Sequence, residues 1–358
     1  MSGAVLVTGG AGFIGSNIAD RLAVEGRHVL IYDTLARPGV ERNLDWLRER
    51  HPARITPIVA DVRDAAELAR AVREADAVFH MAAQVAVTTS LDDPRNDLEV
   101  NILGTFNLLE AVRAQGGQKP VIFASTNKVY GDLADLEFAS TSEGYLPSDP
   151  VVRAHGIDEA RPLDFHTPYG VSKGAADQYV LDYARSYGVP AAVLRMSCIY
   201  GQRQMGTEDQ GWVAHFLIRA LQDETITLYG DGHQVRDILD VSNAVEAYLA
   251  VWRNIDRVRG RAFNLGGGAA NAVSLRTLLA HMGRLLGRDV DVRFSDWRAG
   301  DQRYFVADTR AAQAALGLGP KLGWRQGVER LAHWLAEERG LPLSTGAAQP
   351  VPQPAVAL

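Results

Sequence analysis

Tyr169 and Lys173 are four residues apart in the segment YGVSK, on a predicted helix. Side chains at this spacing lie on one face of a helix. A lysine ammonium beside a phenol favours the phenolate and so lowers the pKa of the tyrosine. Tyr169 directly follows Pro168, at the expected start of the helix, where a side chain can face a cleft. The pair therefore predicts a tyrosine that acts as a general base near neutral pH.

A second group of polar residues ends an apolar run in the segment VIFASTNKVYGD. Ser125 to Lys128 supply three hydrogen-bonding side chains and one cation directly after a strand that is expected to be buried. Two interpretations of Lys128 stay open, direct contact with a substrate or an ion pair with an acid of the following loop, such as Asp132 or Glu143.

Glycines follow the first predicted strand in the segment VLVTGGAGFIG. In such a turn, glycine permits a tight bend, a close approach of the backbone to a pyrophosphate, and close packing of helix against strand. The helix that begins here directs its N–H groups and positive dipole end at the phosphates. We expect the cofactor to contact Gly9, Gly12, Phe13, Ile14 and Gly15.

Acidic residues end the next two predicted strands. Asp33 can accept hydrogen bonds from an adenosine ribose and would repel a 2′-phosphate, which favours NAD over NADP. Arg37, four residues later, could instead pair with a phosphate. Asp61 and Val62 are placed to meet the adenine edge, although Asp61 could equally cap the following helix.

Apolar runs alternate with helical patterns through the first half of the chain, which predicts an α/β fold with a Rossmann-type, doubly wound parallel sheet. One helical pattern places Ile14, Ile18 and Leu22 on one face, and another spans residues 97–114. The predicted buried strands are residues 4–8, 28–33, 55–61, 77–83, 121–125 and 191–196.

The alternation weakens after about residue 196, where helices near residues 212–222, 241–251 and 275–286 mix with short strands. We therefore expect a Rossmann domain over residues 1–196, with returning segments near 236–265, and a smaller C-terminal substrate-binding lobe over 197–341. The Pro/Ala-rich end, residues 342–358, is expected to be disordered.

Composition argues against several classes of protein. The chain has 358 residues, a formal net charge of −6 and scattered Lys and Arg, so a nucleic-acid partner is not expected. Neither a membrane span nor a signal peptide is apparent. Cys198 is the single cysteine, which excludes an internal disulfide and fits a cytoplasmic location. The spread of the nine histidines predicts no metal site.

Thr126 together with Tyr169 and Lys173 resembles the catalytic set of the extended short-chain dehydrogenase/reductase family, whose members use NAD(P) to act on nucleotide sugars. The resemblance covers almost the whole chain. It implies that Thr126 forms a hydrogen bond with the reacting sugar oxygen. It also implies that Ala82, Ala83 and Gln84 pass under the cofactor and that Asn101 is a structural asparagine of the active-site helix.

The same resemblance extends to the second lobe through GHQVRD and WRAGDQRYFVAD. It implies that Arg236 and Arg298 bind the nucleotide diphosphate, for which guanidinium groups offer paired donors. Asp301 is expected to hold a ribose hydroxyl. In the segment from residue 201 to residue 216, Arg203 and Gln210 are candidate substrate contacts.

Residues Asn127 and Lys128 stand where the family's 4,6-dehydratases have an Asp-Glu pair, so a site that removes water lacks its carboxylates. The glutamate of the family's decarboxylases is missing too, and the polar pair fits 4-epimerases poorly. The segments STNKVYGD, DQGWV and DQRYFVAD narrow the resemblance to 2-epimerases of the CDP-paratose to CDP-tyvelose type. Such an enzyme would keep NAD bound and recycle it.

Three alternatives stay open: a 4-epimerase, a 2-epimerase of a UDP-, GDP- or dTDP-linked hexose, and a net sugar-nucleotide dehydrogenase. Asn127 is a candidate substrate contact, and the long loop over residues 131–167 could be a lid over the sugar. The resemblance also implies a homodimer or homotetramer, formed through the helix after Val100 and the helix after Tyr169.

Overall fold

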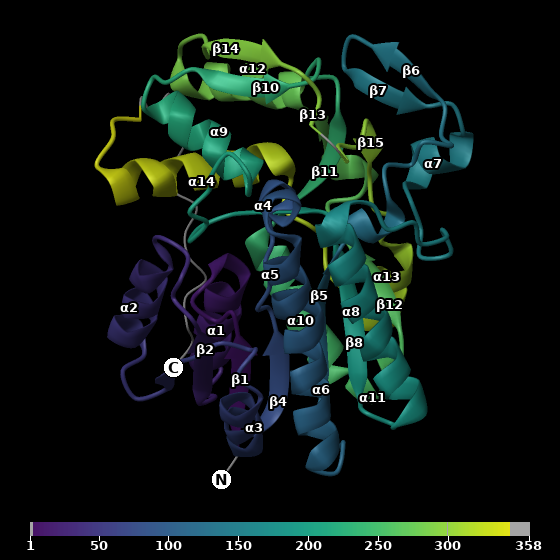
Figure 1. Cartoon of the computed structure of the whole chain (residues 1–358). Helices are drawn as coiled ribbons and strands as arrows, with labels where there is room; N and C mark the ends of the chain where they lie inside the picture. The colour runs from purple at the N-terminus through teal and green to yellow at the C-terminus, as the bar shows by residue number, and fades with distance from the viewer. Residues whose placement is uncertain (1–2, 299, 344–358) are drawn as a thin grey trace.

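A seven-stranded parallel sheet forms the centre of the larger lobe (Figure 1). The computed structural model describes residues 3–298 and 300–343, so the expected tail lies almost wholly outside the described residues. Every pairing in this sheet is parallel, which confirms the predicted Rossmann-type α/β fold. In spatial order the strands are β12 (Ala262–Leu265), β8 (Ala191–Met196), β5 (Val121–Thr126), β4 (Ala75–His80), β1 (Ala4–Thr8), β2 (Val29–Asp33) and β3 (Ile55–Val59).

The apolar runs become strands because both faces of the sheet are covered, so nearly every side chain of the central strands is buried. The strand β3 differs from the prediction of a buried strand. Thr56, Pro57 and Val59 are exposed, because β3 is the edge of the sheet and pairs only with β2 among the sheet's strands. An edge position also tolerates Pro57, which has no N–H to donate.

Helices cover the two faces of this sheet in two groups (Figure 1). On one face pack α1 (Phe13–Val24), α2 (Val40–Arg50), α10 (Val241–Arg253), α11 (Ile255–Val258) and α13 (Arg310–Leu316). On the other face pack α3 (Ala65–Glu74), α6 (Gly104–Ala114) and α8 (Thr167–Ser186). The chain therefore returns to the larger lobe through α10 and β12 after it has entered the smaller one.

The helix predicted over residues 97–114 is in fact three consecutive pieces. It begins earlier, at α5 (Pro94–Leu98), where the Asp93 side chain accepts a hydrogen bond from the Asn96 N–H. A π-helical turn at Glu99–Leu103 follows, and α6 continues from Gly104. A π turn inserts one extra residue per turn, which periodicity alone does not reveal. Before this helix lies the short α4 (Val87–Asp92).

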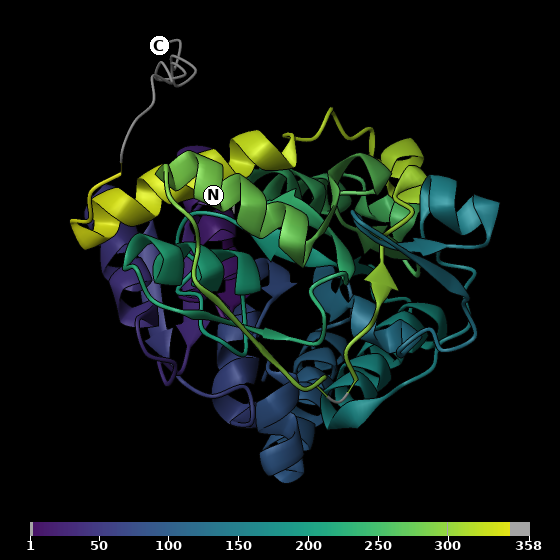
Figure 2. The same ribbon diagram turned by 90° about the horizontal axis from the view of Figure 1, so that it is seen from above.

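The smaller lobe lies above the carboxyl ends of the strands (Figures 1 and 2). Its own apolar core joins three helices, and the bounds expected for the first two, near 212–222 and 275–286, differ from those observed by at most one residue. The helices are α9 (Trp212–Leu221), α12 (Leu275–Leu286) and α14 (Trp324–Arg339). The strands are β9 (Cys198–Tyr200), β10 (Ile226–Tyr229), β11 (Val235–Asp240), β13 (Ala272–Ser274), β14 (Val292–Ser295) and β15 (Tyr304–Phe305).

The loop expected over residues 131–167 carries structure of its own. It contains the hairpin β6 (Phe138–Thr141) and β7 (Gly144–Pro147), followed by α7 (Pro150–His155). Its backbone is bonded to the smaller lobe, from Tyr145 N to His233 O at 2.9 Å and from Ile157 N to Val306 O at 2.7 Å. The hairpin lies beside the end of β15 in Figure 1. Whether this segment closes over a sugar stays a prediction.

Among the described residues, no helix is long and apolar enough to cross a membrane. The cytoplasmic location stays a prediction.

Candidate active site

The glycine turn lies at the carboxyl end of β1, where the sheet order reverses between β1 and β4. Parallel sheets bind ligands in the crevice at such a reversal. Gly9 has φ +65, and a Cβ there would lie 2.7 Å from Ala82 N. A Cβ on Gly15 would lie 2.2 Å from Gly9 O. The turn can therefore exist only with glycine at both positions. It lies directly against Ala82, which is expected to pass under the cofactor.

Asp33 is held at the edge of this turn. One carboxylate oxygen accepts a hydrogen bond from Ala11 N at 3.0 Å, and the other accepts one from Leu35 N at 2.9 Å. Burial raises the pKa of Asp33, and these backbone N–H groups oppose the shift. Burial also lowers the pKa of Arg37, the alternative phosphate ligand. The structure thus presents a carboxylate beside the glycine turn, as recognition of a ribose requires.

Asp61 does not cap the following helix, so that alternative is wrong. The cap is Asp64, whose side chain accepts hydrogen bonds from Ala66 N and Glu67 N. Asp61 instead pairs with Arg63 at 2.6 Å, an interaction that lowers the pKa of Asp61. The sequence-based expectation named only Asp61, whereas Asp64, three positions later, is the residue whose carboxylate reaches the first N–H groups of the helix. Its contact with adenine stays a prediction, as does that of the buried Val62.

Asn101 connects α8, the helix that carries Tyr169 and Lys173, to the segment around Gln84 that is expected to pass under the cofactor. Its side chain accepts a hydrogen bond from Gln84 N at 2.9 Å and donates one to Gln84 O at 3.1 Å. The same amide donates to Ser172 Oγ on α8 at 3.0 Å and to Asp97 at 3.2 Å. Asn101 is buried in the π-helical turn, which aims its side chain at both elements. The residue therefore positions the floor segment that includes Ala83 rather than reaching out toward solvent.

Thr126, Tyr169 and Lys173 meet where β5 ends and α8 begins. All three are buried, and the Thr126 and Tyr169 side chains share a hydrogen bond. Tyr169 N donates to Ser90 Oγ at 3.1 Å, which fixes the start of the helix. Lys173 Nζ lies 4.2 Å from the centroid of the Phe123 ring. The predicted catalytic set is thus brought together, and Ser90 is a supporting residue that no sequence signal identified.

The electrostatics of this set differ from the expectation. Burial raises the pKa of Tyr169 to about 12, opposed by the hydrogen bond with Thr126 and reinforced by the charge of Asp97. Burial also lowers the pKa of Lys173 to about 7, opposed by Asp177 and Asp97. Lys173 is not among the groups that lower the pKa of Tyr169 here, and the role of Tyr169 as a general base stays a prediction. Removing water from both groups disfavours both charged forms, and a partly neutral lysine stabilises a phenolate weakly.

Lys128 has a partner that neither interpretation of the sequence included. Its ammonium donates a hydrogen bond to Gly300 O at 2.9 Å, so it ties the end of β5 to the second arginine segment. Burial lowers the pKa of Lys128 to about 8, reinforced by Arg236 and opposed by Asp301. One bond uses one of three ammonium protons, so the contact leaves donors for a ligand.

The predicted diphosphate residues form two neighbouring ion pairs. Arg236 is buried and its guanidinium lies 2.7 Å from Asp301. Arg298 pairs with Glu208 at 3.0 Å and lies 3.7 Å from the centroid of the Tyr229 ring. The structure thus brings Arg236, Asp301 and Lys128 into one charged group, with Arg298 beside the loop that carries Gln210.

The other two candidate substrate contacts have different surroundings. The Arg203 guanidinium lies 4.1 Å from the centroid of the Trp46 ring on α2 and 5.4 Å from that of the Trp334 ring on α14. These contacts give Arg203 a packing role between the lobes, where the sequence predicted a substrate contact. The backbone of Gln210 closes a turn with Thr207, through hydrogen bonds of 2.9 and 3.2 Å.

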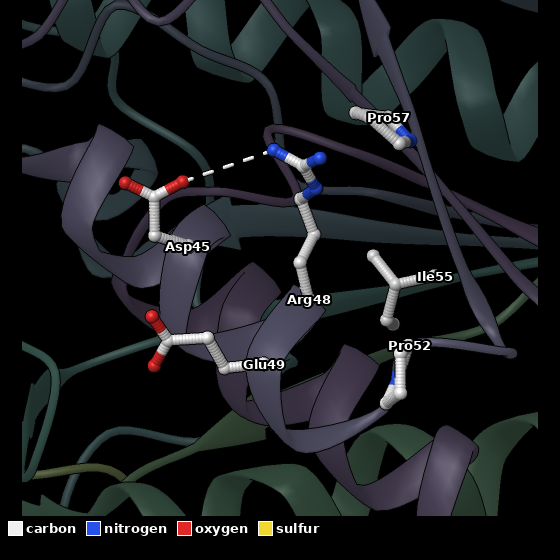
Figure 3. Close-up of a pocket in the computed structure, with 6 residues that line it drawn as sticks. All are labelled: Asp45, Arg48, Glu49, Pro52, Ile55 and Pro57. Carbon is white, nitrogen blue, oxygen red and sulfur yellow. Dashed lines mark ion pairs between the residues drawn. The ribbon is translucent and has the colours of Figure 1, made fainter.

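Two further features lie outside the catalytic set. Figure 3 shows a surface pocket of about 480 Å³ at the start of β3, lined by Asp45, Arg48, Glu49, Pro52, Ile55 and Pro57. It is next to the amino end of an edge strand, so it does not adjoin the strand ends that carry the site.

In the loop over residues 131–167, possible metal-ligand atoms of Asp132, Asp164 and His166 lie within 4.8 Å of one another. His166 Nε2 lies 3.1 Å from an Asp164 carboxylate oxygen, so this histidine has a polar partner within the loop itself.

Residues 5–266 match the model of the NAD dependent epimerase/dehydratase family. A CDP-paratose 2-epimerase from Salmonella typhi is 40% identical over 339 residues, which cover 92% of this chain and 98% of that protein.

Solved structures with this fold are also similar. A UDP-glucose 4-epimerase from Thermotoga maritima, with UDP-glucose, has a TM-score of 0.80 and 29% identity, over 94% of this chain and 99% of that one. A UDP-glucose 4-epimerase from Thermus thermophilus, in complex with NAD, has a TM-score of 0.77 and 32% identity, over 93% of this chain and 98% of that one. The similarity therefore extends over both lobes.

The depressed pKa of Lys128 predicts a pH-dependent contribution to stability. Its pKa is about 8 in the folded chain and about 10.4 in an unfolded one. Between these values the unfolded chain binds more protons, so the free energy of unfolding rises with pH in this window. We expect the wild type to gain stability relative to Lys128→Met between pH 8 and about 10. Denaturant unfolding at several pH values measures this, and parallel curves would contradict the assignment.

Proposed function

Because the chain belongs to the NAD dependent epimerase/dehydratase family, we propose that it is a nucleotide-sugar 2-epimerase of the CDP-paratose to CDP-tyvelose type. The observation that carries the proposal is the end of β5, where Thr126 is followed by Asn127 and Lys128 instead of carboxylates. A site without an acid and a base at this point can oxidise and reduce a carbon but is poorly equipped to eliminate water. The 40% identity to a CDP-paratose 2-epimerase supports the same choice.

The residues at the glycine turn fit NAD, the cofactor of the family. Gly9 and Gly15 permit the tight turn that leads from β1 into α1, at whose N-terminus a pyrophosphate would bind, and Asp33 offers its carboxylate to a ribose. When bound, NAD supplies a hydride acceptor that becomes the hydride donor, so C2 of the sugar passes through a 2-keto state and is reduced from its opposite face. Because the cofactor is restored in each cycle, it has no need to leave.

The protein's own part in the reaction is proton transfer and orientation. We assign Tyr169 as the base that takes the proton of the sugar 2-hydroxyl and later returns it. Thr126, which shares a hydrogen bond with Tyr169, holds the same sugar oxygen. The raised pKa of Tyr169 means that the phenolate needs added positive charge, which protonated Lys173 and the nicotinamide cation would provide.

The other end of the substrate is assigned to the arginine segments. Arg236 is buried beside Asp301, so its guanidinium is pre-oriented for a diphosphate, and Arg298 lies at the rim near Gln210. Asp301 is the candidate for a ribose hydroxyl. These groups recognise the diphosphate and the ribose and leave the nucleotide base unspecified, so a UDP-, GDP- or dTDP-linked hexose is the alternative substrate.

A 4-epimerase is the second candidate function, because two of the similar solved structures are UDP-glucose 4-epimerases. It would use the same Thr126, Tyr169 and Lys173 on the sugar 4-hydroxyl. A net sugar-nucleotide dehydrogenase would use them as well and release the reduced cofactor. The three differ in products, so product analysis separates them.

We further propose that the chain forms a homodimer or a homotetramer through α6 and α8, which pack side by side. Leu103, Phe106, Val171 and Tyr179 expose apolar side chains on these helices and on the turn before α6. The Phe106 and Tyr179 rings meet at 6.1 Å between centroids. Contiguous exposed apolar surface of this kind marks protein interfaces. Tyr183, also on α8, is buried, and its hydroxyl donates a hydrogen bond to Glu110.

Product analysis in heavy water tests the reaction. We expect the protein to invert C2 of CDP-paratose without deuterium at C2, because the hydrogen leaves and returns as hydride. NMR follows the product, with CDP-, GDP-, UDP- and dTDP-hexoses as a panel. Deuterium at C2 would indicate enolisation, conversion at C4 would favour the 4-epimerase, and free NADH in step with product would indicate a dehydrogenase.

Tyr169→Phe tests the base. The variant keeps the ring and loses the hydroxyl, so we expect it to keep bound NAD and lose about 10²–10⁴-fold in kcat. Cofactor content is read from absorbance after denaturation, and the rate from the NMR assay. Near-normal turnover by a variant that retains its cofactor would refute the assignment.

Introducing negative charge into the exposed apolar face of α6 and α8 tests the proposed assembly. We expect the wild type to have two or four times the chain mass of 38.9 kDa by light scattering. The double variant Phe106→Asp/Tyr179→Asp should be monomeric, because a buried carboxylate without a partner is costly. Phe294→Asp is the matched control, since Phe294 is an exposed aromatic residue on β14. An unchanged mass for the double variant would place the interface elsewhere.

A further inference from the structure

Gln302 is a fully buried side chain with a partner for each of its polar groups. Its amide oxygen accepts a hydrogen bond from Asn127 Nδ2 at 2.9 Å, and its amide nitrogen donates to Gly131 O at 2.5 Å. Its backbone oxygen accepts from the Arg236 guanidinium at 2.5 Å. One residue thus touches the end of β5, the start of the long loop and the predicted diphosphate ligand.

The directions of these hydrogen bonds follow from the chemistry of the partners. Gly131 O is a carbonyl and can only accept, so the Gln302 amide must turn its nitrogen toward it. The Gln302 oxygen then faces Asn127, so the Asn127 side chain must turn its nitrogen toward Gln302 to donate a hydrogen bond. The Asn127 oxygen is left facing Thr126 and accepts from the Thr126 hydroxyl at 3.4 Å. A backbone carbonyl therefore determines, through two amides, which Asn127 atom faces Thr126: it is the oxygen, a second acceptor beside Tyr169 for the single Thr126 proton.

The same contacts join the two ends of the proposed substrate site. A continuous series of hydrogen bonds runs from Arg236 through Gln302 and Asn127 to Thr126. The Lys128–Gly300 bond runs parallel to it, between the same two segments. The residue that would hold the diphosphate and the residue that would hold the reacting oxygen are thereby kept in one rigid arrangement.

We propose that Gln302 is a positioning residue for the reaction. It acts through Asn127, whose amide orients the Thr126 hydroxyl, and it keeps Thr126 at a set distance from Arg236. This inference rests on the proposed function in that Thr126 holds the reacting oxygen of a nucleotide sugar. It assigns Asn127 to the support of Thr126, where the sequence suggested a substrate contact.

Gln302→Met tests the role, because methionine has a similar length and makes none of the amide hydrogen bonds. We expect kcat to fall by about 10²-fold, since loss of orientation at a reacting group has effects of this size, while KM stays within about threefold. Loss of both kcat and folding would not distinguish positioning from structure, so a matched control is required.

Asn271→Leu is that control. Asn271 is also a buried amide with two hydrogen bonds to backbone, to Leu322 O at 3.1 Å and from Trp324 N at 2.8 Å, but it lies just before β13 and binds the start of α14. We expect both variants to melt at a lower temperature than the wild type and only Gln302→Met to lose kcat at a temperature where both are folded. Equal kcat values for the two variants would overturn the proposal.

A double-mutant cycle tests the route through Asn127. If Gln302 acts by orienting Asn127, the variant Asn127→Ala/Gln302→Met should be no more than about twofold slower than the slower single variant. Losses that multiply would mean that the two side chains act independently, and would overturn the proposed series.

Failure of the inference can be told apart from failure of the proposed function. The nucleotide sugar that the wild type converts decides the function, whereas the ratio of kcat values on that same sugar decides the role of Gln302. Threonine-methyl NMR of the NAD-loaded protein gives a decision without turnover, with Thr126→Ser to assign the signal. We expect one sharp Thr126 signal in the wild type and Asn271→Leu, and a shifted, broadened signal in Gln302→Met. An unchanged signal would overturn the proposal.

Discussion

The buried ion pair between Asp177 and Arg195 holds the catalytic helix on the sheet. Both oxygens of Asp177 accept hydrogen bonds from Arg195 at 3.0 Å, and Ser125 Oγ donates to the same carboxylate at 2.7 Å. A paired, fully bonded charge of this kind is costly to disrupt because either partner alone would be buried without compensation. Since Asp177 follows Lys173 by one turn of α8, the position of Lys173, the lysine proposed for catalysis, depends on this contact.

The same burial that orders the site opposes the charges that the chemistry needs. Tyr169 and Lys173 both lie out of water, and both have pKa values shifted toward the neutral form. Asp177 and Asp97 favour protonated Lys173, but Asp97 also disfavours the Tyr169 phenolate. The protein therefore places Tyr169, the proposed base, in a setting where a cationic cofactor would favour the phenolate. A site of this kind would be reactive mainly when it is loaded.

The two lobes meet at the carboxyl ends of the strands, and their contact is specific at the residue level. Segment 300–302 of the smaller lobe bonds directly to Asn127 and Lys128 of the larger one. This junction distinguishes the chain from a Rossmann domain with a loosely attached lobe. It also gives the polar pair after Thr126 a physical function, because both side chains bridge to the segment that carries Asp301.

The sequence by itself determined the local features of this protein. Apolar runs and their spacing predicted most strands and helices, and the glycine turn and the pair Tyr169/Lys173 were recognised because their meaning depends on near neighbours in the chain. Edge exposure of β3, the packing of Arg203 between two tryptophans and the capping role of Asp64 were not. Only the tertiary structure decided the pKa shifts of Tyr169 and Lys173 and the partners of Lys128 and Gln302. Burial and contacts across 170 or so residues of chain arise from packing, and no local pattern encodes them.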